Sequence, residues 1–380
     1  DKEPEVNTCD LIIRDNVEDT GREPNLTTDI HWDSPDIWVR NQNDSIEVHE
    51  NPYYSLDHIN VYVYVRITNR GTQKYHAGSK YLHVHWADAS TAISDKAWTG
   101  HEEYNGDLTG YFMYPQPINV DIEPGESEVV VVPWMLPQSL RGTADGNEHF
   151  CILTEITDNA LISERSFDVF GNRTIAQKNL MIIKCTADED AVGEVFVRNL
   201  KDTERSYTLE IRPRTVDDRE LFTKSDVCTI LSDEIKDAWQ SGGSRYSGAS
   251  YSPSVPNKIN IDSYDAKVRG IKLAGEEFEK VTMQFAFHVF MIGPNNMPVL
   301  PVLKNEYTFD LIQKDEETGE IVGGETFVVR SPFSYGGVAV HPVSEDMGDH
   351  YTLRAICPED ITSVEWTDAE GNVICNTLSV

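Results

Sequence analysis

The chemistry most readily expected from this sequence is cation binding by a carboxylate-rich stretch near its start. Residues 14–25 read RDNVEDTGREPN, and WDSPDIWVR follows at 32–40. Calcium prefers six to eight oxygen ligands, mostly carboxylates and carbonyls on turn-rich loops. The spacing differs from that of an EF-hand loop, and a chain this acidic also produces such clusters on solvated faces without any function. The residues predicted to hold calcium, if it is bound, are Asp15, Asp19, Glu23, Asp33 and Asp36.

A second possible metal site is the His-x-His pair in HVHWAD, residues 83–88. On a strand, His83 and His85 project to one face, and the apolar residues that alternate with them face the other way. Two imidazoles on one face could share a metal, with Asp88, His101 or Glu102 as a third ligand. The alternative is that the pair lies on the polar face of an ordinary sandwich strand. The sequence lacks the glutamate and the later histidine that a cupin site would supply.

The sequence contains none of the common signatures of catalysis. There is no Gly-x-Ser-x-Gly, no His-Glu-x-x-His and no Cys-x-x-Cys, and the six cysteines are widely scattered. No carboxylate pair stands out from the acidic background as a glycosidase pair. We therefore favour a non-catalytic binding protein. The alternatives are a metal-dependent or carbohydrate-active enzyme that uses His83 and His85, and a structural assembly subunit that pairs through exposed strands.

Aromatic side chains in the less regular segments could form a contact surface for a protein or carbohydrate partner. Trp and Tyr anchor many interfaces, because each ring combines a large apolar area with a polar tip. One such segment is 94–117, and another is 243–257, GSRYSGASYSPSVPN, whose composition is typical of an antibody paratope. A flexible insertion is the alternative for the second segment. The rings predicted to contact the partner are Trp98, Tyr104, Tyr111, Tyr114, Tyr246 and Tyr251.

Strands must position these residues, because the strongly patterned segments alternate with a period of two. NVYVYVRITNRG at 60–71 alternates and ends in a turn, and INVDIEPGESEVVVVPW at 118–134 reads as strand, turn, strand. A second set of such segments begins after residue 190. The best helix candidate is 225–240, with Ser225 as its cap and two glycines after its end.

This pattern predicts an all-β protein made of two Ig-like or fibronectin-like β-sandwiches. A chain of 380 residues is too long for one ordinary core, so one 380-residue β fold is the weaker alternative. The predicted boundaries are an acidic segment at 1–28, a first sandwich at 29–190, a second sandwich at 191–335 and a C-terminal hairpin at 336–380.

The charge of the chain excludes one class of partner. Lys and Arg number 32 against 64 Asp and Glu, which gives a net charge of −32. Such a field repels nucleic acids and anionic membrane surfaces. No segment approaches the roughly 20 apolar residues of a membrane span. The first residues lack the features of a signal peptide, so we expect either a cytosolic protein or one whose signal was removed.

The first half of the chain resembles a known class of module. DLIIRDNVEDTGREPN (10–25), WDSPDIWVRN (32–41), HENPYY (49–54), NVYVYVRITNRG (60–71), VHWADAST (84–91), IEPGES (122–127) and HFCILTEI (149–156) occur in this order. The order is similar to that of secreted bacterial proteins carrying Ig-like modules of the CARDB type, the cell-adhesion-related domain found in bacteria. The resemblance implies an extracellular or cell-surface sandwich with an interaction role, often accessory to an enzyme. No catalytic domain is evident in this chain.

Overall fold

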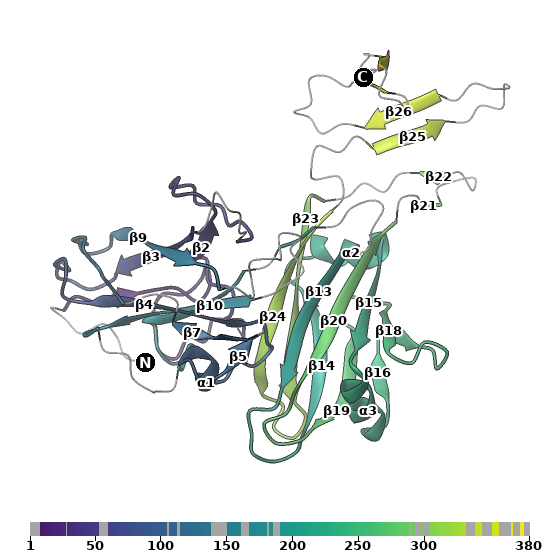
Figure 1. The fold of residues 1–380 in the computed structure, drawn as a ribbon, viewed down its shortest axis with the longest axis horizontal. Helices are drawn as coiled ribbons and strands as arrows, with labels where there is room; N and C mark the ends of the chain where they lie inside the picture. Colours follow the sequence, from purple (N-terminus) through teal and green to yellow (C-terminus); the bar gives the residue numbers. More distant parts are fainter. Residues whose placement is uncertain are drawn as a thin grey trace.

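The computed structural model describes residues 8–27, 29–52, 60–104, 106–111, 115–137, 150–160, 167–180, 182–184, 191–288, 291–292, 298–299, 304–331, 339–343, 352–356, 366–367 and 373–375. The chain is mostly β and forms two sandwiches of antiparallel sheets, which confirms the predicted fold class. Figure 1 shows the first sandwich in purple and blue beside the second in teal and green. In that view the strands of the two sandwiches run in different directions.

The first sandwich consists of two facing sheets. One sheet contains β1 (Leu11–Ile12), β2 (Ile37–Arg40), β3 (Asn60–Asn69) and β9 (Ser127–Met135). The other contains β4 (Tyr81–Asp88), β7 (Gly110–Tyr111), β8 (Gln116–Pro117), β10 (Phe150–Thr157) and β11 (Ile175–Asn179). Side chains from alternate positions of the strands fill the space between the two sheets. They form one buried cluster that includes Val61, Val63 and Val65 of β3 and Val84 and Trp86 of β4.

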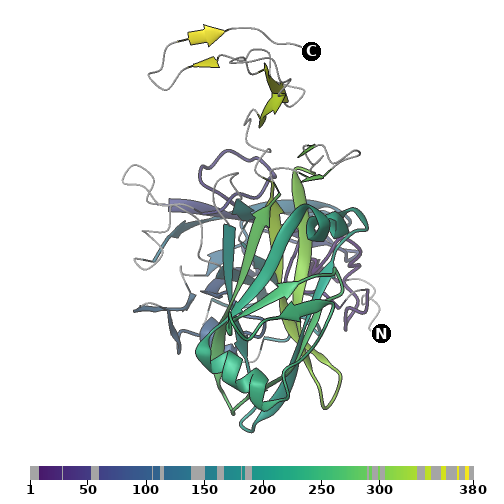
Figure 2. The same cartoon turned by 90° about the vertical axis from the view of Figure 1, so that its right-hand side faces the viewer.

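The second sandwich is also built from two sheets (Figure 2). The first has the order β12 (Ile182–Lys184), β24 (Ile321–Arg330), β23 (Glu306–Asp315), β14 (Arg205–Pro213), β19 (Lys267–Leu273) and β16 (Arg245–Ser247). The second has the order β13 (Ala191–Arg198), β20 (Phe278–Phe287), β15 (Ser225–Leu231), β18 (Lys258–Ile261) and β17 (Ala249–Tyr251). β12 pairs with β24 in parallel, whereas the other pairs of this sandwich are antiparallel.

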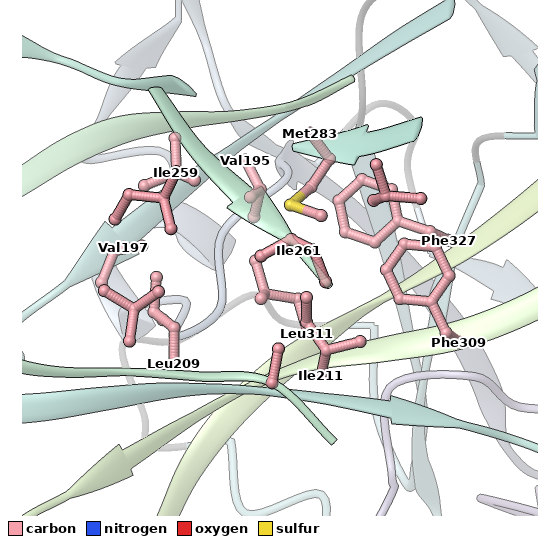
Figure 3. Close-up of a cluster of buried hydrophobic side chains, with 14 of the residues drawn as sticks. Val195, Val197, Leu209, Ile211, Ile259, Ile261, Met283, Phe309, Leu311 and Phe327 are labelled. Atoms are coloured by element: carbon pink, nitrogen blue, oxygen red, sulfur yellow. The ribbon is translucent and has the colours of Figure 1, made fainter. Parts of the chain in front are cut away.

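The core of the second sandwich lies between its two sheets, and Figure 3 shows part of it. Val195, Ile259 and Met283 come from one sheet, and Phe309 and Phe327 from the other; all five are fully buried. The rings of Phe309 and Phe327 are stacked, with their centroids 5.1 Å apart. Because the two sheets contribute interdigitating side chains from alternate positions, this sandwich has a core of its own.

The helices are short and lie outside the sheets. They are α1 (Asp95–Trp98), the 3-10 helix η2 (Asp217–Glu220), α2 (Leu221–Lys224) and α3 (Asp233–Ser241). The helix predicted over 225–240 is wrong in its first half, which is β15. α3 begins instead after Ser232, whose side chain accepts a hydrogen bond from the backbone N–H of Ile235. The residues Val227, Thr229 and Leu231 are buried with strand periodicity, and this burial overrides the helical pattern.

Short strand pairs complete the structure. They are β5 (Glu103–Tyr104) with β6 (Asp107–Leu108), β21 (Met291–Ile292) with β22 (Pro298–Val299), β25 (Ala339–Val343) with β26 (Thr352–Ile356), and β27 (Trp366–Thr367) with β28 (Val373–Cys375). The C-terminal segment predicted as one hairpin thus contains two such pairs. In the part of the chain that the structure describes, no helix has the length and apolar character needed to cross a bilayer.

Candidate binding cleft

The two sandwiches are joined by backbone hydrogen bonds at the edge of β13. The N–H of Phe196 donates to the carbonyl of Ala89 at 3.0 Å, and the N–H of Thr91 donates to the carbonyl of Phe196 at 2.8 Å. Ser90 and Phe196 form a parallel bridge. The segment after β4 therefore continues the sheet of the second sandwich for a short distance, which fixes the register between the two units.

Gln313 of β23 strengthens the same contact from within the junction. Its side chain is fully buried, and its Nε2 donates to the carbonyl of Arg198 at 2.7 Å. Its Oε1 accepts from the hydroxyl of Thr91. On the outside, Arg198 forms an ion pair with Glu102 at 2.8 Å. A buried amide whose donor and acceptor are both used specifies one arrangement of its neighbours.

An ion-pair network crosses the junction at a second place. Arg214, which follows β14, contacts Asp33 of the first sandwich at 3.1 Å and Asp310 of β23 at 2.5 Å. Lys178 of β11 also pairs with Asp33. Burial opposes ionisation of Asp33, but the two cations hold its pKa below the usual value. The network therefore keeps a charged carboxylate between the sandwiches.

Two adjacent glycines in β24 allow the first sandwich to approach this closely. A Cβ atom at Gly323 would overlap the carbonyl oxygen of Thr91, and one at Gly324 would overlap the indole of Trp32. Glycine inside a strand often marks such an approach of another backbone or ring. The Gly-Gly step is therefore a local sequence signal of this junction.

A cleft of about 700 Å³ opens beside this junction. The first sandwich contributes Trp32 and the segments 90–93 and 167–170, and the second contributes 319–324. Its apolar lining consists of Ile93, Phe167, Phe170, Leu200, Ile321 and Val322. The size and the position between two domains are those of a typical ligand site, and the lining combines apolar and polar groups.

Polar groups also line the cleft. Trp32 is 3% exposed and its indole Nε1 has no hydrogen-bond partner among the described residues. The ring of His31 contacts Trp32 and Phe170 edge-on, at centroid distances of 5.7 and 5.0 Å. Burial lowers the pKa of His31, so its imidazole is neutral at neutral pH. Lys314 and the carboxylates of Asp29, Asp168 and Glu320 complete the lining.

The carboxylates predicted to bind calcium do not form one cluster. Asp15 and Asp19 are buried together, and Asp19 accepts from the N–H groups of Asp15 and Gly21 at 3.1 and 2.6 Å. Glu23 accepts from the backbone of Arg173 at 3.2 Å. Asp33 belongs to the junction, as described above. Among the described residues there is no group of three His, Cys, Asp or Glu suited to a metal ion.

Asp36, the fifth predicted ligand, is neutralised by an arginine. It is fully buried, and it accepts from Arg14 Nε and Nη2 at 2.9 and 2.6 Å. The backbone N–H of Arg14 also donates to Asp36, at 3.0 Å. Asp36 thus fastens the N-terminal strand to the start of β2. Calcium binding by this region remains a prediction.

His83 and His85 lie on one face of β4, as the alternation predicts, but that face is covered rather than exposed. Both rings are fully buried, and their centroids are 6.4 Å apart. His85 Nδ1 lies 2.7 Å from the carbonyl oxygen of Trp98, and His83 Nε2 lies 2.7 Å from the hydroxyl of Thr157. These contacts give both histidines a structural role in packing α1 and the end of β10 onto the sheet.

The predicted aromatic surface is only partly accessible. Trp98 is 3% exposed and packs with Leu153 and Ile175, so its assignment to a contact surface is wrong. Tyr104 lies in β5 and Tyr111 in β7, and Tyr114 lies outside the described residues. The segment predicted as a loop at 243–257 contains β16 and β17. There Tyr246 is 43% exposed, and half-buried Tyr251 packs edge-on against Trp239 at 5.0 Å.

Comparisons with known proteins give a loose structural likeness. No protein-family model and no curated protein matches the chain. The collagen adhesin of S. aureus is 10% identical, with a TM-score of 0.19, over 78% of this chain and 92% of the adhesin. A serine-rich repeat protein of Streptococcus agalactiae is 11% identical, with a TM-score of 0.20, over 77% of this chain and 90% of that chain.

An enzyme also appears among the similar structures. A β-glucosidase from intestinal bacteria is 16% identical over 32% of this chain, with a TM-score of 0.18, and this chain covers 13% of the enzyme. Superpositions this loose show nothing about the ligand or the activity of this protein.

Proposed function

We propose that this protein is a non-catalytic, extracellular or cell-surface binding protein that holds a segment of a protein partner in the cleft between its sandwiches. The observation that carries the proposal is the cleft itself, a space of about 700 Å³ lined by apolar and polar groups beside a fixed junction. A site on rigid elements loses little conformational entropy when it binds, so its contacts contribute more fully to affinity. The predicted kinship with CARDB-like modules is compatible with this role.

The hydroxyl groups in the cleft support binding over catalysis. Ser90 Oγ donates to the carbonyl of Ala92 at 2.9 Å, and Thr91 Oγ1 donates to Gln313 Oε1. Both hydroxyls are thus used inside the junction. A nucleophile instead needs a base within hydrogen-bond reach that can take its proton.

Charge favours a partner segment that carries Lys or Arg beside apolar residues. Asp29, Asp168 and Glu320 line the cleft with one cation, Lys314, and the whole chain carries a net charge of −32. Such a field accelerates the association of cationic partners, and salt screens the effect. We therefore expect binding to be fastest at low ionic strength.

Selection from a random-peptide display library on the whole chain tests this proposal. We expect enriched peptides to combine aromatic or aliphatic residues with Lys or Arg. Leu200→Glu places a charge at a cleft position that is 43% exposed. It should lower the affinity for these peptides at least tenfold. Val216→Glu is the matched control, since Val216 is 69% exposed and is not among the residues that line the cleft.

Two results would contradict the proposal. If the enriched peptides bind the Leu200→Glu variant as well as the wild type, the cleft is not the site. If the purified chain turns over fluorogenic peptide or glycoside substrates, and a His85→Ala variant that remains folded does not, the protein is an enzyme.

A further inference from the structure

A second concave site lies on the second sandwich, apart from the cleft. It is a hollow of about 620 Å³ over β15, β18 and β20. It shares no lining residue with the cleft, so the inference drawn from it does not depend on the proposed function. Phe222 of α2, which is half-buried, forms an apolar wall.

Strand register places a row of polar side chains across the hollow. Cys228 of β15 lies opposite Gln284 of β20 on one side and opposite Asn260 of β18 on the other. Asn260 in turn lies opposite Ser250 of β17. Residues in register on adjacent strands share a face, so the four side chains form one line across four strands.

The small thiol in the middle of this line makes the floor of the hollow. Cys228 is 4% exposed and its Sγ donates to Gln284 Oε1 at 3.2 Å, which directs the amide oxygen toward the floor. Asn260, by contrast, is exposed. Carboxamides both donate and accept hydrogen bonds, a combination that suits hydroxyl groups, which also do both.

Charged groups of both signs line the hollow, and strand register separates them. Asp226 pairs with His288 at 3.1 Å, and Asp262 accepts from Ser250 at 3.2 Å. Strand register places both carboxylates at one end of the hollow and Lys258, opposite Ile230, at the other. Two carboxylates disfavour an anionic ligand, and Lys258 disfavours a cationic one. A row of amides between these oppositely charged ends is therefore suited to a neutral ligand.

We infer that this hollow is a binding site for a neutral oligosaccharide. Asn260 and Gln284 bind its hydroxyl groups, the ion-paired residues bind hydroxyls at the ends, and Phe222 contacts an apolar face of a sugar ring. A peptide segment fits less well, because the hollow offers its side chains fewer apolar groups than the cleft does.

An array of defined neutral and acidic oligosaccharides, probed with the whole chain, tests the inference. We expect neutral glycans to bind, and calorimetry with the best of them to show at least a tenfold loss of affinity for Asn260→Leu and for Gln284→Leu. Thr282→Ala is the matched control, because Thr282 lies on the same outer face of β20 but outside the hollow. Circular dichroism and melting temperature verify that each variant is folded.

The cleft variant Leu200→Glu separates this inference from the proposed function. It should leave glycan affinity unchanged. Peptide binding can therefore fail while glycan binding persists, and glycan binding can fail while peptide binding persists. The inference is overturned if no neutral glycan binds above background. It is also overturned if only acidic glycans bind, or if Asn260→Leu binds the glycan as the wild type does.

Discussion

Asp15 is a carboxyl group enclosed by its neighbours. It is 2% exposed, and Asn25 donates to it at 3.3 Å. Burial, together with the nearby charge of Asp19, raises its pKa from 3.8 to about 8. The native state therefore holds a proton that the unfolded chain releases above about pH 4, so the free energy of unfolding should fall as the pH rises from about 4 to 8.

Asp15→Asn should remove this pH dependence. The amide is neutral at every pH, so we expect the variant to be more stable than the wild type at pH 7 in EDTA, by roughly 1–4 kcal/mol. Urea unfolding at pH 4.5 and pH 7 measures the difference, which should be small at the lower pH. If calcium binds here, it raises the melting temperature of the wild type but not of the variant. A variant less stable than the wild type at pH 7 in EDTA would refute the protonated carboxyl.

Glu325 is a second buried carboxyl, at the junction of the sandwiches. It is 1% exposed and faces the thiol of Cys151 at 3.8 Å, and burial raises its pKa well above the usual value. The sign is the same as for Asp15: stability is lost as the pH rises above the unfolded pKa. We expect Glu325→Gln to raise the free energy of unfolding at pH 8. This gain should exceed the effect of the same substitution at pH 5 by about 1–3 kcal/mol. Exposed Glu320→Gln is the control; equal shifts in both variants would contradict the assignment.

At the scale of elements, α3 depends on a cap seven residues beyond the one that the sequence predicts. Ser232 accepts from the N–H of Ile235 at 3.1 Å, and Ile235 and Trp239 are fully buried against the sandwich. Ser232→Ala should cost about 1 kcal/mol of stability in chemical unfolding. Ser241→Ala, at the exposed C-terminal end of the same helix, should change it by a few tenths at most. Equal losses from the two variants would show that the cap is not the cause.

The sequence predicts where strands form far better than it predicts which elements pack against them. Alternation of the kind seen in β3 reports which face is buried, so sandwich strands could be found from local pattern. The segment before α3 carries strand and helix periodicities together, so its local pattern also fits a helix. Only tertiary burial decides in favour of the strand. The alternation places His83 and His85 on one face of β4, but a local pattern does not show that this face is buried, with His85 beside the carbonyl of Trp98 in α1.

At the scale of the whole molecule, the junction is set by contacts between residues distant in sequence. Arg214 pairs with Asp33, and Gln313 bonds to Arg198 and Thr91. No local pattern identifies such partners, so the cleft could not be derived from the sequence. The glycines of β24 were the one local sign of the close approach.

Gly324→Val should separate the two sandwiches, because there is no room for its side chain against Trp32. We expect a loss of roughly 2–4 kcal/mol by overpacking and a larger radius of gyration in small-angle scattering. The control is Gly319→Asn, at an exposed turn where φ is +75° and no atom lies near an added Cβ; asparagine tolerates this conformation. An unchanged scattering profile for Gly324→Val would refute the tight junction.

The pairing of Phe196 with residues 89–91 also affects how the protein behaves in concentrated solution. β13 lies at the end of its sheet, and an edge with free N–H and C=O groups can recruit strands from other molecules. Here part of that edge is occupied by the protein's own first sandwich, so intramolecular docking also protects against aggregation. Gly324→Val should therefore form oligomers as its concentration rises, and sedimentation velocity should show the wild type unchanged over the same range.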